Sequence, residues 1–360
     1  MKQFGSRIVF FVPAGRDVLA LIGRCGLIGL LVPGLAAAGE TVDPYAGYST
    51  SVRLRFVDAP APGALLASIP HLTVSFGGAP RAAVLDTGST GVAVSAAAIP
   101  DIAALPSRGP ASLAYSSSGR IMRGTLVVTA VTIAGGDGAS LTTLPIPVLA
   151  VTRIDCLPAA RHCTPEQLPP HVAMLGVGFG REYDRQAIGT PDKNPFLNVA
   201  TAPGERIRRG YVITAEGVHV GLTEGDTAGG FSFVKLTPDP RWPDWEAAPA
   251  CITLGETAPA CGKLLADTGV AGMYLTVPAD GPGAGIGTSI GIRLGRLDDP
   301  HVLGYRFVVG DTSNPLAPET VTLSGIGVRP TFVNTGFHLL NGFDYLYDAD
   351  GGRVGFRRKE

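Results

Sequence analysis

Apolar residues along this chain fall in short alternating or continuous runs, which predicts β-strands. Clusters of Gly, Pro, Asn and Ser bound most of these runs, as is typical of turns between strands. The expected strands lie at 52–57, 71–76, 82–85, 145–151, 210–214, 219–222 and 231–236. No segment keeps a helical period over three turns, and the best helix candidates, 63–67 and 337–343, are short. The pattern therefore predicts an all-β protein.

Two longer hairpins stand out. Residues 112–116 and 125–133 are rich in β-formers and flank the turn Ser-Ser-Gly-Arg at 117–120. A second hairpin is expected over 250–263, and residues 181–209, rich in charge, Pro and Gly, are expected to separate two halves of the chain.

Composition narrows the class of protein. The chain has 360 residues, of which 45% are hydrophobic, and its 49 Gly and 30 Pro favour strands and turns over long helices. That length can bury one large core or two joined cores. The net charge of −1 gives no indication of nucleic-acid binding, since a basic surface is the usual mark of that function.

Residues 1–38 are expected to be a signal peptide and not part of the fold. An apolar stretch at 26–35 is followed by Ala36-Ala37-Ala38, and basic residues precede it: Lys2, Arg7, Arg16 and Arg24. An uncleaved anchor would carry Arg24 into the bilayer, which is unfavourable. We therefore expect an exported bacterial protein, periplasmic or secreted, with no stable membrane insertion after cleavage.

Export gives the cysteines a role. Apart from Cys25, the cysteines form two closely spaced pairs, Cys156 with Cys163 and Cys251 with Cys261. In an oxidising compartment these favour two local disulfides, among the three connectivities that four cysteines allow. The alternative, a metal site built from Cys156, His162 and Cys163, lacks the usual two-residue spacing and a fourth ligand. No metal site is therefore predicted at these cysteines.

One short phrase occurs twice. Residues 84–92 read Val-Leu-Asp-Thr-Gly-Ser-Thr-Gly-Val, and residues 265–273 read Leu-Ala-Asp-Thr-Gly-Val-Ala-Gly-Met. Each half also has a later Gly after an apolar run, Gly176 and Gly336. This self-similarity predicts two lobes of the same design, related by a pseudo-two-fold axis.

The repeated aspartates, Asp86 and Asp267, suit acid–base hydrolysis. If the two loops meet, the like charges cannot both ionise, and the pair shares one proton. The ionised carboxylate can take a proton from water while the protonated one polarises the carbonyl under attack. Gly88 and Gly269 are expected to allow tight turns with positive φ.

At these residues the chain resembles the pepsin-like aspartic proteases, over roughly residues 68–360. The resemblance lies in four segments, 71–89, 174–178, 264–269 and 336–356. It implies a bilobal fold, with an N-terminal lobe at 39–195, a C-terminal lobe at 196–360, a substrate cleft between them and no cofactor. It also implies that Thr87 and Thr268 cross-link the catalytic loops. The 112–133 hairpin takes the place of the family's flap, where Tyr115 matches the flap tyrosine.

Some positions depart from the family pattern. Ser89 keeps the hydroxyl that supports the first aspartate, but Val270 replaces the hydroxyl residue usual after the second motif. Losing that hydrogen bond should raise the pKa of Asp267 and move the activity optimum to less acidic pH than that of pepsin. The tryptophan that usually partners the flap tyrosine is missing, and Asn334-Thr335 replaces an apolar pair, which leaves the packing there open.

The sequence therefore predicts an exported, monomeric aspartic endopeptidase that acts on peptide or protein substrates through Asp86 and Asp267. The alternative is a catalytically silent pepsin-like fold that serves as a binding or inhibitor module. Intact aspartates and threonines favour catalysis, whereas Val270 and the missing tryptophan favour the silent alternative. A retroviral-type homodimer is disfavoured because one chain carries both motifs. Nothing in the sequence identifies the preferred substrate.

Overall fold

A computed structural model describes residues 43–115, 117–158, 160, 163–181, 186, 189–278, 283–323 and 330–359. The all-β prediction is confirmed: the described chain forms three β-sheets with only short helical turns. The predicted signal peptide lies outside the described residues. Among the residues that the structure describes, no helix is both long and apolar enough to span a bilayer.

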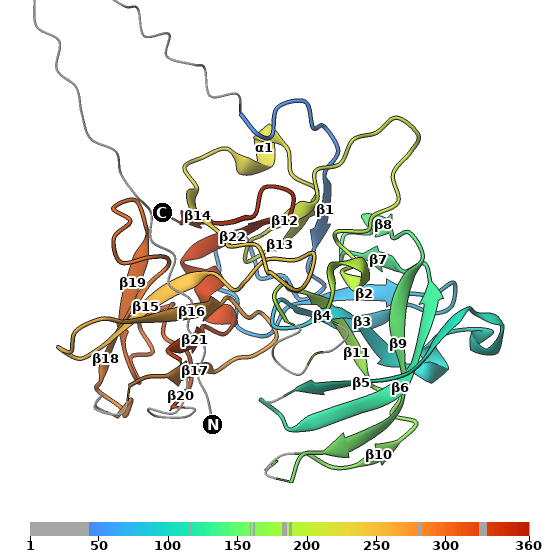
Figure 1. Cartoon of the computed structure of the whole chain (residues 1–360), viewed down its shortest axis with the longest axis horizontal. Helices are drawn as coiled ribbons and strands as arrows, with labels where there is room; N and C mark the ends of the chain where they lie inside the picture. The colour runs from blue at the N-terminus through green and yellow to red at the C-terminus, as the bar shows by residue number, and fades with distance from the viewer. Residues whose placement is uncertain are drawn as a thin grey trace, which may run out of the picture. The chain divides into compact units, whose positions relative to one another are not determined.

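A ten-stranded sheet is built entirely from the first half of the chain (Figure 1). Its order is β5-β6-β9-β4-β11-β3-β2-β7-β8, with β10 paired to β9. Its strands are β2 (His71–Ser75), β3 (Arg81–Asp86), β4 (Thr90–Ser95), β5 (Ser107–Tyr115), β6 (Arg120–Thr129), β7 (Thr132–Ala134), β8 (Ser140–Thr142), β9 (Ile146–Cys156), β10 (Glu166–Gln167) and β11 (Ala173–Val177).

A seven-stranded sheet is built entirely from the second half, in the order β19-β18-β15-β16-β21-β17-β20. Figure 1 shows its yellow to red strands as a group separate from the blue and green strands of the ten-stranded sheet. Its strands are β15 (Pro249–Leu254), β16 (Ala260–Leu265), β17 (Met273–Thr276), β18 (Ser289–Arg293), β19 (Gly304–Val308), β20 (Val321–Leu323) and β21 (Phe332–Asn334).

The same pairing surrounds each Asp-Thr-Gly motif. In the first half, β3 leads into the motif and pairs parallel with β11, which pairs antiparallel with β4. In the second half, β16 leads into the motif and pairs parallel with β21, which pairs antiparallel with β17. The repeated phrase in the sequence thus corresponds to a repeated three-strand unit.

A six-stranded sheet combines strands from both halves, in the order β1-β13-β12-β22-β23-β14. Its strands are β1 (Val52–Arg55), β12 (Gly210–Ile213), β13 (Gly217–Val220), β14 (Ser232–Lys235), β22 (Phe343–Asp348) and β23 (Arg353–Arg358). β1 belongs to the predicted N-terminal lobe, yet it pairs with β13 across four register positions. This pairing joins the two predicted lobes, and no local pattern in the sequence indicates it.

Helical structure is confined to short turns. The single described α-helix, α1 (Glu224–Thr227), is held by a capping box between Thr223 and Asp226. The 3-10 turns are η1 (Ala96–Ala98), η2 (Ile102–Ala104), η4 (Pro191–Lys193) and η5 (Phe337–Asn341). The helix expected at 337–343 is therefore a 3-10 turn. The helix expected at 63–67 was wrong, because Gly63 adopts the left-handed conformation and the segment is irregular.

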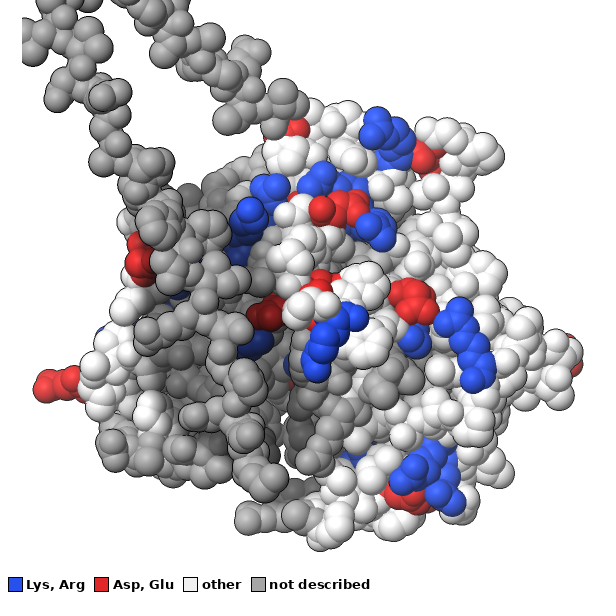
Figure 2. All heavy atoms as spheres, in the orientation of Figure 1, with Lys and Arg blue, Asp and Glu red and all other residues white. Residues whose placement is uncertain are grey.

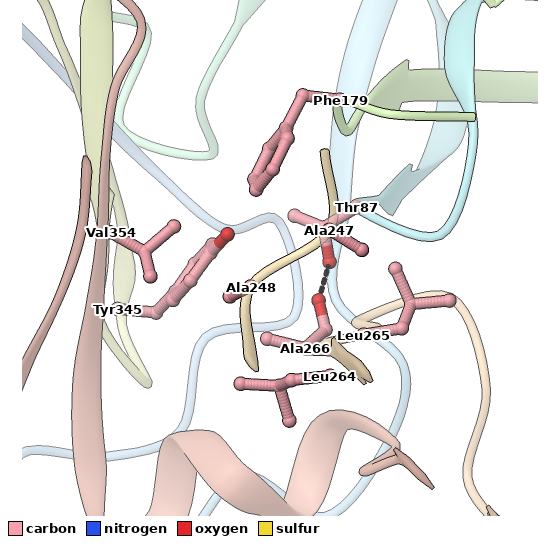
Figure 3. A pocket seen from close by; sticks show the side chains of 9 residues that line it. All are labelled: Thr87, Phe179, Ala247, Ala248, Leu264, Leu265, Ala266, Tyr345 and Val354. Atoms are coloured by element: carbon pink, nitrogen blue, oxygen red, sulfur yellow. Dashed lines mark hydrogen bonds between the residues drawn. The ribbon is translucent and has the colours of Figure 1, made fainter. Parts of the chain in front are cut away.

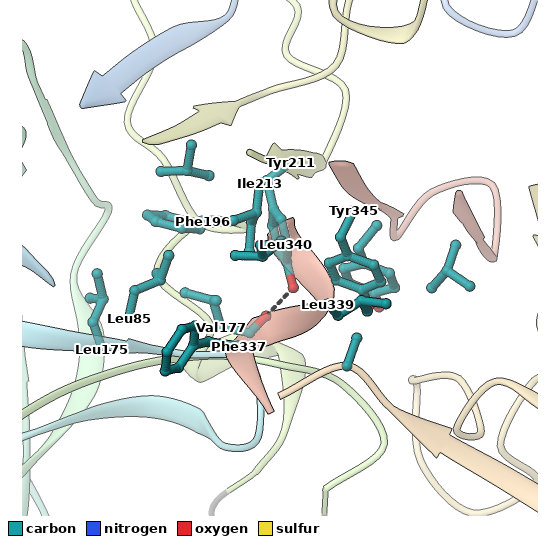
Figure 4. Packing of buried hydrophobic residues seen from close by; sticks show 14 of the residues in the cluster. Leu85, Leu175, Val177, Phe196, Tyr211, Ile213, Phe337, Leu339, Leu340 and Tyr345 are labelled. Carbon is teal, nitrogen blue, oxygen red and sulfur yellow. Dashed lines mark hydrogen bonds between the residues drawn. The ribbon is translucent and has the colours of Figure 1, made fainter. Parts of the chain in front are cut away.

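One large hydrophobic cluster takes buried side chains from all three sheets. Figure 4 shows part of it, where Val177 of the ten-stranded sheet lies next to Tyr211 of the six-stranded sheet. The Tyr211 hydroxyl donates a hydrogen bond to the Val177 carbonyl at 2.7 Å, which satisfies a buried polar group. This core fixes the strands that carry the first aspartate.

Both predicted disulfides are confirmed, Cys156–Cys163 and Cys251–Cys261. The first pairing takes up both cysteines of the alternative metal site, and His162 lies outside the described residues. Cys251 and Cys261 face each other across the β15–β16 hairpin, at the position where that second hairpin was predicted.

On the face of the molecule shown in Figure 2, the basic and acidic side chains are interspersed.

Candidate active site

The structure brings Asp86 and Asp267 together. Asp86 ends β3, Asp267 follows β16, and their side chains are joined by a hydrogen bond. Both residues are buried, with 3% and 5% of their surface exposed. Each carboxyl group also lies against the glycine of the opposite loop, Asp267 against Gly88 and Asp86 against Gly269.

The two motif glycines provide space for this approach. A Cβ atom placed on Gly88 or Gly269 would come within 3.0 Å of the opposite carboxyl group. Neither glycine has a positive φ, so the prediction that they permit left-handed turns was wrong. Gly91, the later glycine of the first motif, does have a φ of +96°. A side chain at Gly88 or Gly269 would occupy the space of the partner aspartate.

Thr87 and Thr268 cross-link the two loops, as the resemblance implies. The Thr87 hydroxyl donates to the Ala266 carbonyl, and the Thr268 hydroxyl donates to the Leu85 carbonyl at 2.6 Å. Each hydroxyl also accepts the backbone N–H of the other threonine, at 2.9 and 3.1 Å. Figure 3 shows the Thr87–Ala266 bond beside a void of about 10 Å³, which is too small for a substrate.

Asp86 is held by the first loop. The Gly88 N–H donates to its Oδ1 at 2.7 Å, and the Ser89 hydroxyl donates to its Oδ2 at 2.5 Å. The Tyr115 hydroxyl lies 3.4 Å from Ser89 Oγ. The predicted flap tyrosine therefore reaches the first aspartate through Ser89. Trp245 has another partner, since its indole N–H donates to the Ala349 carbonyl.

Tyr115 lies at the end of the predicted hairpin, which the structure confirms as β5 and β6. β6 also pairs along its other edge with β9, from Arg120 opposite Cys156 onward. At the turn, the Leu157 N–H donates to the Gly119 carbonyl at 2.8 Å. The hairpin is thus attached to the segment that carries the Cys156–Cys163 disulfide.

Asp267 is supported from a place that the sequence analysis missed. The Gly269 N–H donates to its Oδ1 at 2.8 Å, and Asn334 Nδ2 donates to its Oδ2 at 2.6 Å. The expectation that Val270 costs Asp267 a side-chain hydrogen bond was wrong, because Asn334 supplies one from β21. Two departures in the second half of the sequence could have indicated this contact, namely the missing hydroxyl at Val270 and the unexpected polar residue at Asn334.

Burial dominates the electrostatics of the pair. Burial and the charge of Asp267 raise the pKa of Asp86 to about 7, against the opposing hydrogen bonds from Ser89 and Gly88. Burial also raises the pKa of Asp267, against the hydrogen bonds from Asn334 and Gly269. The two carboxyl groups can therefore hold one proton between them in weakly acidic solution.

Two further residues near the pair lie in the segment that was expected to separate the halves. Arg181 is buried, and its positive charge opposes the effect of burial on the pKa of Asp86 and of Asp267. Gln186 is also buried, and its Nε2 donates to the Gly88 carbonyl at 3.2 Å. The sequence gave no sign that Arg181 or Gln186 contributes to the site, because both roles depend on the tertiary structure that brings this segment next to the first loop.

The arrangement can perform acid–base chemistry. It offers a buried pair of carboxyl groups and a nearby tyrosine, with a cation to limit the cost of the negative charge. No group of three or more potential metal ligands occurs within the part of the chain that the structure describes. No model of a known protein family matches this chain, and no curated protein matches it either.

Proposed function

We propose that this protein is a pepsin-like aspartic endopeptidase with a bilobal fold that hydrolyses peptide bonds. The observation that carries the proposal is the contact between two buried aspartates from duplicated strand units, each held by its own loop. The Thr87–Thr268 cross-link supports it, because it fixes the relative position of the two loops. The two disulfides support export to an oxidising compartment.

The reaction follows from one shared proton. The ionised carboxylate takes a proton from a water molecule, whose oxygen attacks the peptide carbonyl carbon. The protonated carboxyl group gives its proton to the carbonyl oxygen, and a tetrahedral diol forms. Burial and the charge of Asp86 raise the pKa of Tyr115, so its hydroxyl stays protonated and can donate a hydrogen bond above the pair.

The alternative, a silent binding or inhibitor module, is now less favoured. Val270 was one of its two supports, and Asn334 supplies the hydrogen bond that Val270 cannot. The missing tryptophan was the other, and Tyr115 reaches Ser89 without it.

Cleavage of a diverse peptide library, read by mass spectrometry between pH 3 and 8, tests the proposal. We expect defined cleavage sites and inhibition by a statine-containing peptide, which mimics the tetrahedral intermediate. A folded protein that binds the statine peptide but cleaves nothing would support the binding module. A folded protein that does neither would contradict the proposed endopeptidase.

We expect the pH profile of kcat/KM to be bell-shaped, with its maximum between about pH 4 and 7. Activity needs one proton on the pair. It should fall as pH rises through about 7, where Asp86 loses that proton. On the acidic side it should fall when Asp267 also becomes protonated, and burial places this step above the ordinary pKa of aspartate. Initial rates on one peptide across the range measure both limbs. A maximum below pH 3 would contradict the expectation.

A further inference from the structure

The two aspartates receive side-chain hydrogen bonds of different chemical kinds. Ser89 Oγ lies 2.5 Å from Asp86 Oδ2, and Asn334 Nδ2 lies 2.6 Å from Asp267 Oδ2. A hydroxyl group can donate or accept, whereas an amide NH₂ can only donate. Ser89 therefore suits either protonation state of Asp86 Oδ2, but Asn334 needs an acceptor, which an ionised carboxylate provides best.

The orientation of the Asn334 amide is fixed by its other end. Its Oδ1 accepts the Gly336 N–H at 3.1 Å, so the NH₂ group must face Asp267. The side chain is buried, and Asn334 sits in β21 with neighbours on both sides, opposite Leu265 in β16 and Tyr274 in β17. A flipped amide would place an oxygen against a carboxylate oxygen and would leave the Gly336 N–H unpaired.

The strand register shows that the donor comes from a different place in each half. Two residues before its aspartate, the first half pairs Val84 with Met174, and the second half pairs Leu265 with Asn334. Asn334 thus occupies the position equivalent to Met174, which has no donor. In the first half the donor is Ser89, in the loop, and the equivalent loop residue in the second half is Val270.

The other charged or titratable groups around Asp267 do not remove this asymmetry. The hydrogen bond between Asp86 and Asp267 lowers the pKa of Asp267, which favours the charge on Asp267. Arg181 acts on both carboxyl groups in the same direction. Tyr115 lies on the side of Asp86, through Ser89.

We propose that Asn334 is a positioning residue that replaces the missing loop hydroxyl and holds the negative charge on Asp267, so that the shared proton resides on Asp86. This inference rests on the proposed function, and it assigns the role of general base to Asp267 and that of general acid to Asp86. Asp267 takes the proton of water as the water oxygen bonds to the carbonyl carbon, and Asp86 protonates the carbonyl oxygen. In the second step Asp267 returns its proton to the leaving nitrogen as the C–N bond breaks, and Asp86 recovers a proton from the diol.

The test compares Asn334→Ala with the double variant Asn334→Ala/Val270→Ser, which restores a hydroxyl at the position equivalent to Ser89. We expect Asn334→Ala to lower kcat roughly 10- to 100-fold, the range for losing a hydrogen bond to a charged group. The acidic limb of its pH profile should move to higher pH by about one unit, because the ionised form of Asp267 has lost its donor. The added serine should reverse much of both changes.

Two controls make the result specific. Ser89→Ala removes the donor of Asp86, so it should move the alkaline limb to higher pH and leave the acidic limb in place. Asn334→Leu removes the donor but keeps a side chain of the same number of heavy atoms, branched at Cγ, and it replaces Asn334→Ala if that variant does not fold. Thermal melting of each variant shows whether it is folded.

A readout that does not need activity separates this inference from the proposed function. Carbon-13 NMR of labelled aspartate carboxyl groups, assigned with Asp86→Asn and Asp267→Asn, follows each titration directly. We expect Asp267 to ionise at lower pH than Asp86, and this order to weaken or reverse in Asn334→Ala. Asp86 ionising first in the wild type, or no change in Asn334→Ala, would overturn the inference whether or not peptides are cleaved. If adding Val270→Ser to Asn334→Ala did not reverse the shift in the pKa of Asp267, the inference that Asn334 replaces the missing loop hydroxyl would be wrong.

Discussion

Replacing Asp86 or Asp267 by Asn is expected to lower kcat/KM for peptide cleavage by about 10²- to 10⁴-fold, the usual contribution of a positioned acid or base. The amide keeps the size of the carboxyl group but cannot carry the shared proton. Because both groups act on the same proton, the double variant should lose little more than either single variant. Initial rates on one library-derived peptide measure the effect. Asp311→Asn, on an exposed loop, is the matched control and should keep wild-type activity.

The same variants should also differ from the wild type in melting temperature, in a pH-dependent way that does not require a substrate. The folded-state pKa of both aspartates is raised above the ordinary value, so the folded state favours their protonated forms. The contribution of Asp86 to stability is therefore fully present below about pH 4 and is lost as pH rises through about 7. Asn cannot ionise, so Asp86→Asn should melt at a higher temperature than the wild type at pH 8, and this advantage should shrink toward pH 4. Parallel melting curves across the range would show that the pair is not buried as described.

Alanine at Gly88 or Gly269 is expected to reduce activity by about 10²-fold or more, since displacing catalytic groups by about 1 Å can have this effect. The added Cβ would come within 3.0 Å of the opposite carboxyl group, so that group must move. Overpacking of this kind also costs about 1–3 kcal/mol of stability. Steady-state kinetics and thermal melting measure the two effects.

The control for this pair is Gly285→Ala. Gly285 has neither a positive φ nor any atom within 4 Å of its would-be Cβ, so alanine there should change neither activity nor melting temperature. If Gly88→Ala kept wild-type kcat/KM in a folded protein, the two loops would not hold the aspartates as closely as described.

Local patterns in the sequence predicted several of the strands, the two hairpins, both disulfides and the two aspartates. Each depends on residues close together in the chain or on a repeated phrase. The pairing of β1 with β13 could not be predicted in this way, because it joins segments far apart in sequence that carry no shared motif.

The same limit applied within the site. Asn334 looked like a packing irregularity until the register placed it beside Asp267. Arg181 and Gln186 lay in a segment whose composition indicated a linker. The role of Gly88 was also misjudged, because the atom that would collide with its side chain belongs to the other half of the chain. The chemistry was readable from local motifs, but the supporting contacts depend on tertiary structure.

The six-stranded sheet has a consequence for the order of assembly. β22 and β23 follow the other strands of this sheet along the sequence, yet they are inner strands, and β22 connects β12 with β23. β1, β12 and β13 can pair with one another first, but the sheet stays open until residues 343–358 join it. Contacts of such long sequence separation form slowly. The six-stranded sheet therefore depends for its closure on the two of its strands that come last along the sequence.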